Sequence, residues 1–249
     1  RRPPAPGFFL FCCLPLTVAS WYDGGNRITK GVIIMTNTEK ERQKAITTAG
    51  NPAKPTGEAG QQMLARMNES HAALTAWGLS HFQWHGNEKV LDIGCGGGAN
   101  LHRMSTHITA GHLTGIDYSP TSVQTSCQTN AADIAAGKMT VCEGSVEALP
   151  FADNTFDKIT TVESFYFWPN PPENLKEVRR VLKPGGTFLL IAEIYSHDGL
   201  SAEVQENIEH YHLYNPTPET FETIFHRAGF PSVQVHIEKD HRWICVEGR

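Results

Sequence analysis

The sequence lacks the cysteine, histidine and apolar patterns that mark several common classes of protein. Its 6 cysteines include no C-x-x-C pair and its 12 histidines no H-x-x-H pair, so no zinc, redox or other metal site is predicted. Beyond residues 1–34, no stretch approaches the roughly 18 apolar residues of a membrane span. No segment of the sequence repeats another, which argues against a repeat architecture.

Basic clusters are also absent, and the balance of charge is acidic. The net charge is −5, and because residues 1–34 contribute +3, the remainder of the chain carries −8. An acidic domain without clustered lysine and arginine argues against nucleic acid as a partner, because phosphate contacts need positive charge. The 249 residues suffice for one α/β domain with a full hydrophobic core.

Residues 1–34 differ in composition from the rest of the chain. Their basic start, apolar run and small residues imitate a secretory signal peptide. The rival interpretation is translated upstream sequence, since Met35 precedes a polar stretch and Lys30-Gly31-Val32 is what a purine-rich bacterial ribosome-binding site would encode. We expect a non-native or disordered leader and a bacterial source. The remaining cysteines are scattered, which fits a reducing cytoplasm.

A glycine-rich loop follows the first strong strand pattern. The strand 88–93 leads into Gly94-Cys95-Gly96-Gly97-Gly98, and a helix pattern begins near Asn100. Glycines let the backbone turn sharply and approach a ligand closely, and the helix start offers unpaired N–H groups. The loop therefore predicts a nucleotide-type cofactor site at the mouth of the strand.

Two cofactor patterns fit this loop. Gly94, Gly96 and Ala99 satisfy the dinucleotide fingerprint G-x-G-x-x-G/A. Asp92, Gly94, Gly96 and Gly98 satisfy D-x-G-x-G-x-G. A pyrophosphate favours a helix N-terminus, but a carboxylate nearby would repel it and would attract a cationic cofactor instead. Asp92 therefore favours the second pattern.

An acid ends the next strand as well. Asp117 lies about 20 residues past the glycine loop, where a carboxylate can bind two ribose hydroxyls. Its alternative role is to open the following helix, with Ser119 as the N-cap and Pro120 in the first turn. The two roles are compatible within one loop, and we expect the ribose role.

Two later motifs complete a recognisable set. The stretch 144–157 reads G-S-V-E-A-L-P-F-A-D-N-T-F-D, and 181–187 reads V-L-K-P-G-G-T. With the glycine loop and Asp117, they resemble class I S-adenosylmethionine (SAM) methyltransferases of the small-molecule type, similar to the ubiquinone/menaquinone and sterol methylase group. The resemblance is strong over residues 90–191.

The resemblance implies a set of cofactor contacts. Asp92 and the glycine loop would hold the methionine part, Asp117 the ribose, and Ser145 with Val146 the adenine. Ser145 departs from the family, which usually has an acid there, although a hydroxyl can still accept one hydrogen bond. The predicted cofactor-binding residues are Asp92, Gly94, Cys95, Gly96, Gly98, Asp117, Tyr118, Ser145, Val146 and Glu163.

Alternating strand and helix patterns predict a doubly wound, seven-stranded, Rossmann-like sheet. The resemblance implies that its last strand is antiparallel. We expect three regions: the leader 1–34, N-terminal lid or cap helices over 35–85, and a SAM-binding methyltransferase domain 86–249 with a lid insertion near 196–217. Single helices are expected over 61–82 and 120–136, and 36–60 is expected to be flexible or to form part of a lid. Strands are expected over 88–93, 112–116, 139–142, 157–162, 187–193, 232–238 and 241–246.

The candidate catalytic residues follow the fourth strand or lie in the lid. Ligands in such sheets bind beyond the carboxyl ends of the strands, which favours Glu163 and Tyr166. His212, with His210, lies in the expected lid. Methyl transfer needs a base only if the nucleophile must lose a proton. His71, on the predicted helix 61–82, is expected to be a packed polar residue.

The sequence thus predicts a SAM-dependent methyltransferase for a small molecule, releasing S-adenosylhomocysteine (SAH). We expect a monomer or homodimer without a nucleic-acid partner. The acceptor atom is not readable. Two alternatives stay open: an NAD-dependent oxidoreductase and a non-catalytic SAM-binding module.

Overall fold

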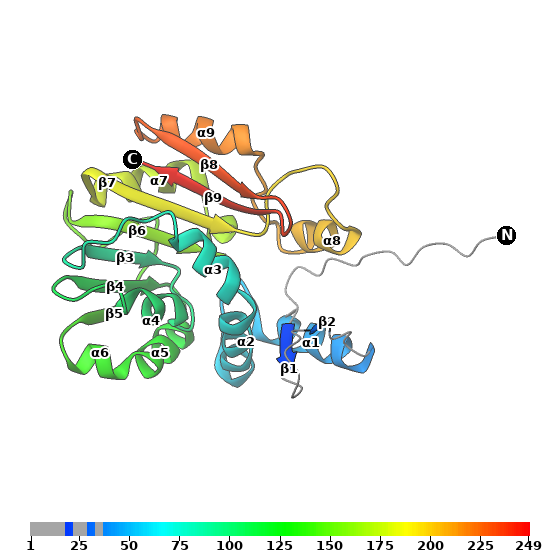
Figure 1. Cartoon of the computed structure of the whole chain (residues 1–249). Helices are drawn as coiled ribbons and strands as arrows, with labels where there is room; N and C mark the ends of the chain where they lie inside the picture. Colours follow the sequence, from blue (N-terminus) through cyan, green and yellow to red (C-terminus); the bar gives the residue numbers. More distant parts are fainter. Residues whose placement is uncertain (1–17, 22–28, 33–36) are drawn as a thin grey trace.

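A seven-stranded sheet forms the centre of the protein. The computed structural model describes residues 18–21, 29–32 and 37–249. The strand order is β5-β4-β3-β6-β7-β9-β8, and β9 runs antiparallel to both of its neighbours (Figure 1). The predicted fold class, with its antiparallel last strand, is confirmed. The strands are β3 (Lys89–Ile93), β4 (His112–Asp117), β5 (Met139–Glu143), β6 (Phe156–Val162), β7 (Leu182–Ala192), β8 (Val233–Glu238) and β9 (Trp243–Gly248).

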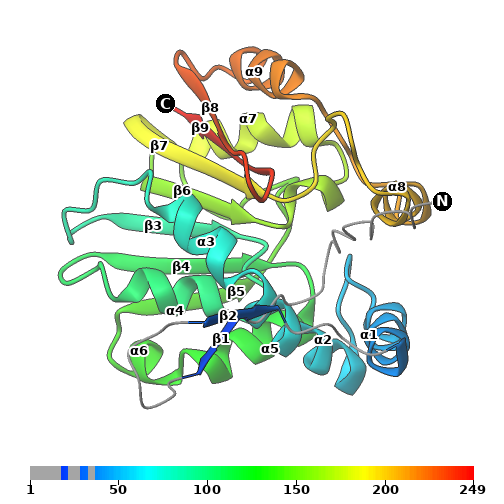
Figure 2. The same ribbon diagram turned by 45° about the vertical axis from the view of Figure 1, so that its right-hand side comes forward.

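Helices cover both faces of this sheet (Figure 2). α3 and α4 pack on one face, and α7 and α9 pack on the other. A short 3-10 helix, η1 (Phe165–Phe167), follows β6. The helices are α1 (Asn37–Gly50), α2 (Gly57–Ser70), α3 (Ala72–Leu79), α4 (Ala99–Ser105), α5 (Pro120–Thr129), α6 (Ala131–Ala135), α7 (Pro171–Val181), α8 (Ala202–His210) and α9 (Pro218–Arg227).

Consecutive strand residues enter two separate hydrophobic clusters. Val90 packs with Leu101 and Met104 of α4, whereas Leu91 belongs to the cluster on the face of α7 and α9. Successive side chains of a strand point to opposite faces, so a central strand covered on both sides must be apolar throughout. This requirement explains the apolar Val90, Leu91 and Ile93 before the glycine loop, which only the buried Asp92 interrupts. The end of this strand places the loop at the carboxyl edge of the sheet.

Several predicted element boundaries were wrong. The single helix 61–82 is two helices, α2 and α3, which break at His71. The predicted helix 120–136 breaks at Asn130, whose side-chain amide donates to the carbonyl oxygens of Gly98 and Ser126. The segment 36–60, expected to be flexible, contains α1 and the start of α2. Tertiary hydrogen bonds and packing outweigh local periodicity at these points.

The expected leader, residues 1–34, lies largely outside the described residues. Its described parts, β1 (Val18–Trp21) and β2 (Thr29–Val32), pair as an antiparallel ribbon. Within the described residues, no helix combines the length and the apolar character needed to cross a bilayer.

Candidate active site

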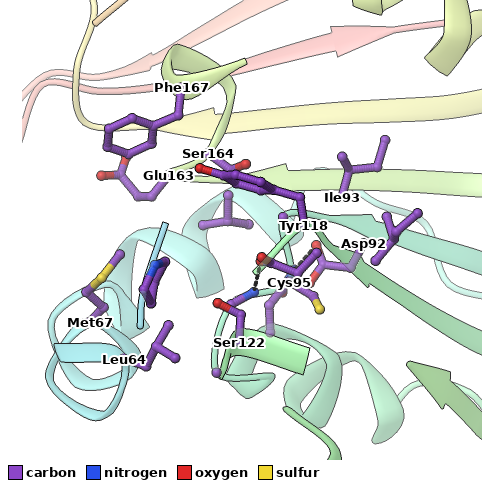
Figure 3. A pocket seen from close by; sticks show the side chains of 18 of the residues that line it. Leu64, Met67, Asp92, Ile93, Cys95, Tyr118, Ser122, Glu163, Ser164 and Phe167 are labelled. Carbon is purple, nitrogen blue, oxygen red and sulfur yellow. Dashed lines mark hydrogen bonds between the residues drawn. The ribbon is translucent and has the colours of Figure 1, made fainter. Parts of the chain in front are cut away.

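A cavity of about 290 Å³ opens at the carboxyl ends of β3, β4 and β6. The glycine loop forms its floor, and residues of α2 and of the segment 52–55 form a wall. Figure 3 shows Leu64 and Met67 of α2 on one side, Asp92 and Cys95 on another, and Glu163 and Phe167 above them. The cavity therefore lies where ligands bind in open α/β sheets.

The glycine loop needs its glycines for conformation and for space. Gly98 has φ of +81°, and a Cβ there would lie 2.5 Å from Ser126 Oγ and from Asn130 Nδ2. Side chains rarely adopt this left-handed conformation, and the close contacts exclude one. Gly98 therefore shapes the loop through its contacts with Ser126 and Asn130, while Gly94, Gly96 and Gly97 line the cavity itself.

Asp117 ties the end of β4 to this loop. Its carboxylate accepts hydrogen bonds from the backbone N–H groups of Gly96 and Ser119, each at 2.9 Å. Burial raises the pKa of Asp117. Ser119 caps α5 by accepting from the Ser122 N–H at 3.2 Å. The capping role therefore belongs to Ser119, and Asp117 lines the cavity with a held carboxylate.

Asp92 is the most buried acid of the cavity, with 1% of its surface exposed. Its Oδ1 accepts from Thr160 Oγ1 at 2.7 Å and from Asn100 Nδ2 at 2.8 Å. Burial raises the pKa of Asp92 to about 7, despite these hydrogen bonds. A cation bound nearby would favour the ionised carboxylate.

Two neighbouring residues modify the expected adenine end. Ser145 and Val146 both line the cavity, as does Glu147. Ser145 Oγ donates to Glu147 Oε2 at 3.1 Å and accepts from the Glu147 N–H. Glu147 thus places an acid beside the position where the family usually has one. In the sequence, the acid two residues after Ser145 was the feature that could have indicated this role for Glu147.

Tyr118 connects the site to the N-terminal part of the chain. Its hydroxyl donates to the carbonyl oxygen of Ala53, and Lys54 Nζ lies 5.3 Å from the centre of its ring. Ser119 Oγ donates to the carbonyl oxygen of Pro55 at 2.5 Å. The segment 52–55 is therefore fastened to the end of β4 and the start of α5 at the wall of the cavity.

Glu163 lies at the end of β6 in a left-handed conformation, with φ of +52°. Its Oε2 accepts from the Tyr166 hydroxyl at 2.7 Å, and its Oε1 accepts from the Glu193 N–H at 2.6 Å. The structure thus brings together two predicted catalytic residues. His71 Nε2 lies 3.7 Å from Glu163 Oε2, so His71 also belongs to this group.

His212 does not join them. It is exposed, with φ of +51°, and is not among the residues that line the cavity. The following Leu213 packs into the core, and the Tyr214 N–H donates to the Tyr166 carbonyl. Because this packing leaves His212 at the surface, the structure does not bring it together with Glu163 and Tyr166. No residue of 196–217 lines the cavity; α2 and 52–55 supply the wall.

Comparison with known families matches this architecture. The family described as "methyltransferase domain" matches residues 85–244, which include the glycine loop and all strands from β3 to β8. The chain belongs to the class I SAM-dependent methyltransferases. The predicted family is confirmed, and SAM is the cofactor of that family.

Curated relatives include quinone and sterol enzymes. The chain is 29% identical over 152 residues to a chloroplastic 2-methyl-6-phytyl-1,4-hydroquinone methyltransferase of Oryza sativa, covering 61% of this chain and 44% of that protein. It is 28% identical to a sterol 4-C-methyltransferase of Caenorhabditis elegans, covering 61% of this chain and 42% of the relative. The chain thus spans less than half the length of these relatives.

A solved structure shows the same fold. The SAM-dependent methyltransferase of Aquifex aeolicus superposes with a TM-score of 0.61 at 20% identity, covering 76% of this chain and 97% of that one.

Proposed function

We propose that the protein transfers a methyl group from SAM to a small-molecule acceptor within the described cavity. The observation that carries this proposal is the acidic lining around the glycine loop. The cavity is lined by four carboxylates, Asp92, Asp117, Glu147 and Glu163, against one guanidinium, Arg103. This charge suits a cationic sulfonium cofactor and opposes the pyrophosphate of a dinucleotide.

In this proposal, the cofactor lies along the carboxyl ends of β3 and β4. Asp117 binds the ribose hydroxyls, Asp92 and Asn100 face the methionine part, and Val146 with Ser145 and Glu147 receives the adenine. Of the predicted loop contacts, Gly94, Cys95 and Gly96 line the cavity, and Tyr118, which is 41% exposed, lines it at the rim. Gly98 is not among the lining residues and instead lies close to Ser126 and Asn130.

The acceptor then lies between the cofactor and the wall formed by α2 and η1. Leu64, Met67, Val162, Phe167 and Trp168 make this end mainly apolar, which suits a flat or apolar acceptor such as a quinol or sterol. The acceptor atom forms a bond to the methyl carbon as the methyl–sulfur bond breaks, and SAH leaves. Holding both in line supplies most of the rate, and Glu163 accepts the acceptor's proton.

Calorimetric titration of the full chain with SAH and with NADH tests the cofactor. We expect SAH to bind with a roughly micromolar dissociation constant and NADH not to bind. Asp117→Ala is expected to weaken SAH binding at least about tenfold, because hydrogen bonds to a charged group contribute about 1.5–3 kcal/mol. Asp240→Ala, which removes an exposed acid in the β8–β9 hairpin, is the control and should bind as the wild type does.

Other results would redirect the assignment. Binding of NADH alone would favour an oxidoreductase, and binding of neither would contradict the proposal. SAH binding without methyl transfer to a methyl-substituted hydroquinone or a sterol would favour a non-catalytic SAM-binding module. A cytoplasmic location and a bacterial source stay predictions from the sequence.

A further inference from the structure

Three ligand-type side chains meet at the acceptor end of the cavity. His71 lies between α2 and α3, Glu163 follows β6, and Glu193 follows β7. One nitrogen of the imidazole and one oxygen of each carboxylate all lie within 4.8 Å of one another. His71 and Glu163 are buried, and Glu193 is partly buried. Because three distant segments supply them, no sequence spacing revealed the group, and the sequence predicted no metal site.

The charges of this group favour a cation. Two carboxylates held close together in a mostly buried place repel each other, and burial strengthens that repulsion. His71 Nε2, 3.7 Å from Glu163 Oε2, supplies a neutral nitrogen lone pair or, when protonated, a single positive charge. A divalent cation between the three would convert the repulsion of the carboxylates into attraction for a shared ion.

The group is also held in place before any ion binds. The Glu163 carboxylate is oriented by the Tyr166 hydroxyl at 2.7 Å and by the Glu193 N–H at 2.6 Å. Glu163 keeps a left-handed backbone, with φ of +52°, which a residue with a side chain adopts only when its surroundings impose it. Hydrogen bonds of this kind commonly orient carboxylates that ligate metals.

We propose that His71, Glu163 and Glu193 bind a divalent transition-metal cation at the acceptor end of the cavity. One imidazole and two carboxylates form a mixed nitrogen and oxygen set, which suits Mn²⁺, Fe²⁺ or Zn²⁺ better than Ca²⁺. Three protein ligands leave coordination positions open, as in catalytic metal sites. His71 and Glu163 both line the cavity, so those positions are accessible from the acceptor side.

An oxygen atom of the acceptor would fill an open position. A metal-bound hydroxyl loses its proton more readily than a free one, which would make it a better nucleophile. In the metal-loaded protein Glu163 would then serve as a ligand, and it would act as the base only in the metal-free site. This role rests on the proposed methyltransferase function, whereas binding of the metal does not. The structure therefore links the site to acceptors that carry a hydroxyl group.

Metal titration of the full chain tests the site. Metal is first removed from the protein with a chelator. Mn²⁺ binding is then measured by the decrease of the paramagnetic resonance signal of the free ion, and Zn²⁺ binding is measured by calorimetry. We expect one equivalent to bind to the wild type and binding to weaken more than tenfold in His71→Gln and in Glu193→Gln. His241→Gln is the matched control, because it removes the imidazole of an exposed His–Glu pair with an N–O distance of 2.9 Å.

Each outcome decides the proposal. Failure of the wild type to bind either ion, or equal binding by the wild type and both variants, would overturn it. If a variant shows no thermal unfolding transition, Tyr166→Phe is tested in its place. This variant removes the hydrogen bond from the Tyr166 hydroxyl to Glu163, and metal binding is expected to weaken about tenfold. SAH titration of the same metal-free samples separates the two proposals, since SAH binding without metal binding sinks the metal site alone.

Discussion

The proposed cofactor end and the proposed acceptor end of the cavity are built in different ways. At the cofactor end, backbone groups of one loop and the acids at the ends of two adjacent strands, Asp92 and Asp117, form the site. At the acceptor end, side chains from the α2–α3 junction, η1 and the ends of β6 and β7 meet. The first end depends on conformation, and the second depends on side-chain chemistry. Substitutions should therefore affect the two ends differently.

The largest difference between the effect on turnover and the effect on cofactor affinity is expected at Glu163. Glu163→Gln keeps the size of the side chain and an oxygen for the Glu193 N–H, but removes the carboxylate. Turnover should fall about 10²- to 10⁴-fold, the usual contribution of a general base, while SAH affinity changes little. The measurement is methyl transfer from SAM to the hydroquinone probe, alongside SAH titration.

His212→Ala is the control for that experiment. It removes an exposed imidazole that the structure places outside the cavity, so turnover and affinity should match the wild type. Equal losses in both variants, or a loss of SAH affinity in Glu163→Gln that matches the loss of turnover, would contradict the division into two ends.

A smaller effect is expected from the conformation of the glycine loop. In Gly98→Ala, the new Cβ would contact Ser126 and Asn130 in a left-handed backbone. We expect about 2–4 kcal/mol of lost stability from strain and overpacking together, with weakened SAH binding. Urea unfolding measures the first and calorimetry the second.

Gly137→Ala isolates the conformational part of that effect. Gly137 also has positive φ, +71°, but a Cβ there meets nothing within 4 Å. It should lose only about 1–2 kcal/mol from the left-handed backbone and keep its affinity for SAH. Equal losses of stability in the two variants would mean that close packing around the loop is unimportant.

The smallest effect concerns Asp92 and pH. Its pKa of about 7 in the empty cavity means that the carboxylate is mostly neutral at pH 6 and mostly ionised at pH 8. Because only the ionised form attracts a cation, affinity for SAM should rise with pH, by up to about tenfold across this interval. Asp92→Asn should lose this rise, which calorimetry at several pH values will show. A rise that persists in the variant would assign it to another group.

The cofactor end could be predicted from the sequence because its signals are local. A strand, a glycine loop and an acid at a fixed spacing follow one another along the chain, and backbone conformation demands glycine at Gly98. The position of Asp117 beside the glycine loop follows from the same short-range pattern, and its role stays a proposal.

The acceptor end could be predicted only in part: the rule that ligands bind beyond strand ends indicated Glu163 and Tyr166, but not the residues that meet them. His71 lies at the break between α2 and α3, where it reaches Glu163. The helical periodicity of 61–82 gave no sign of this break. The position of His212 depends on the packing of Leu213 into the core, which the composition of the segment did not indicate. Glu193 lies near Glu163 because the pairing of β6 with β7 sets the ends of both strands side by side, and this pairing could not be read from the spacing of the two residues.

A crystal structure of the full chain with SAH tests the central claim most directly. The account predicts the ribose hydroxyls within hydrogen-bond distance of the Asp117 carboxylate and the sulfur facing the Glu163 end of the cavity. An SAH molecule bound elsewhere, or one whose sulfur faces away from Glu163, would contradict it.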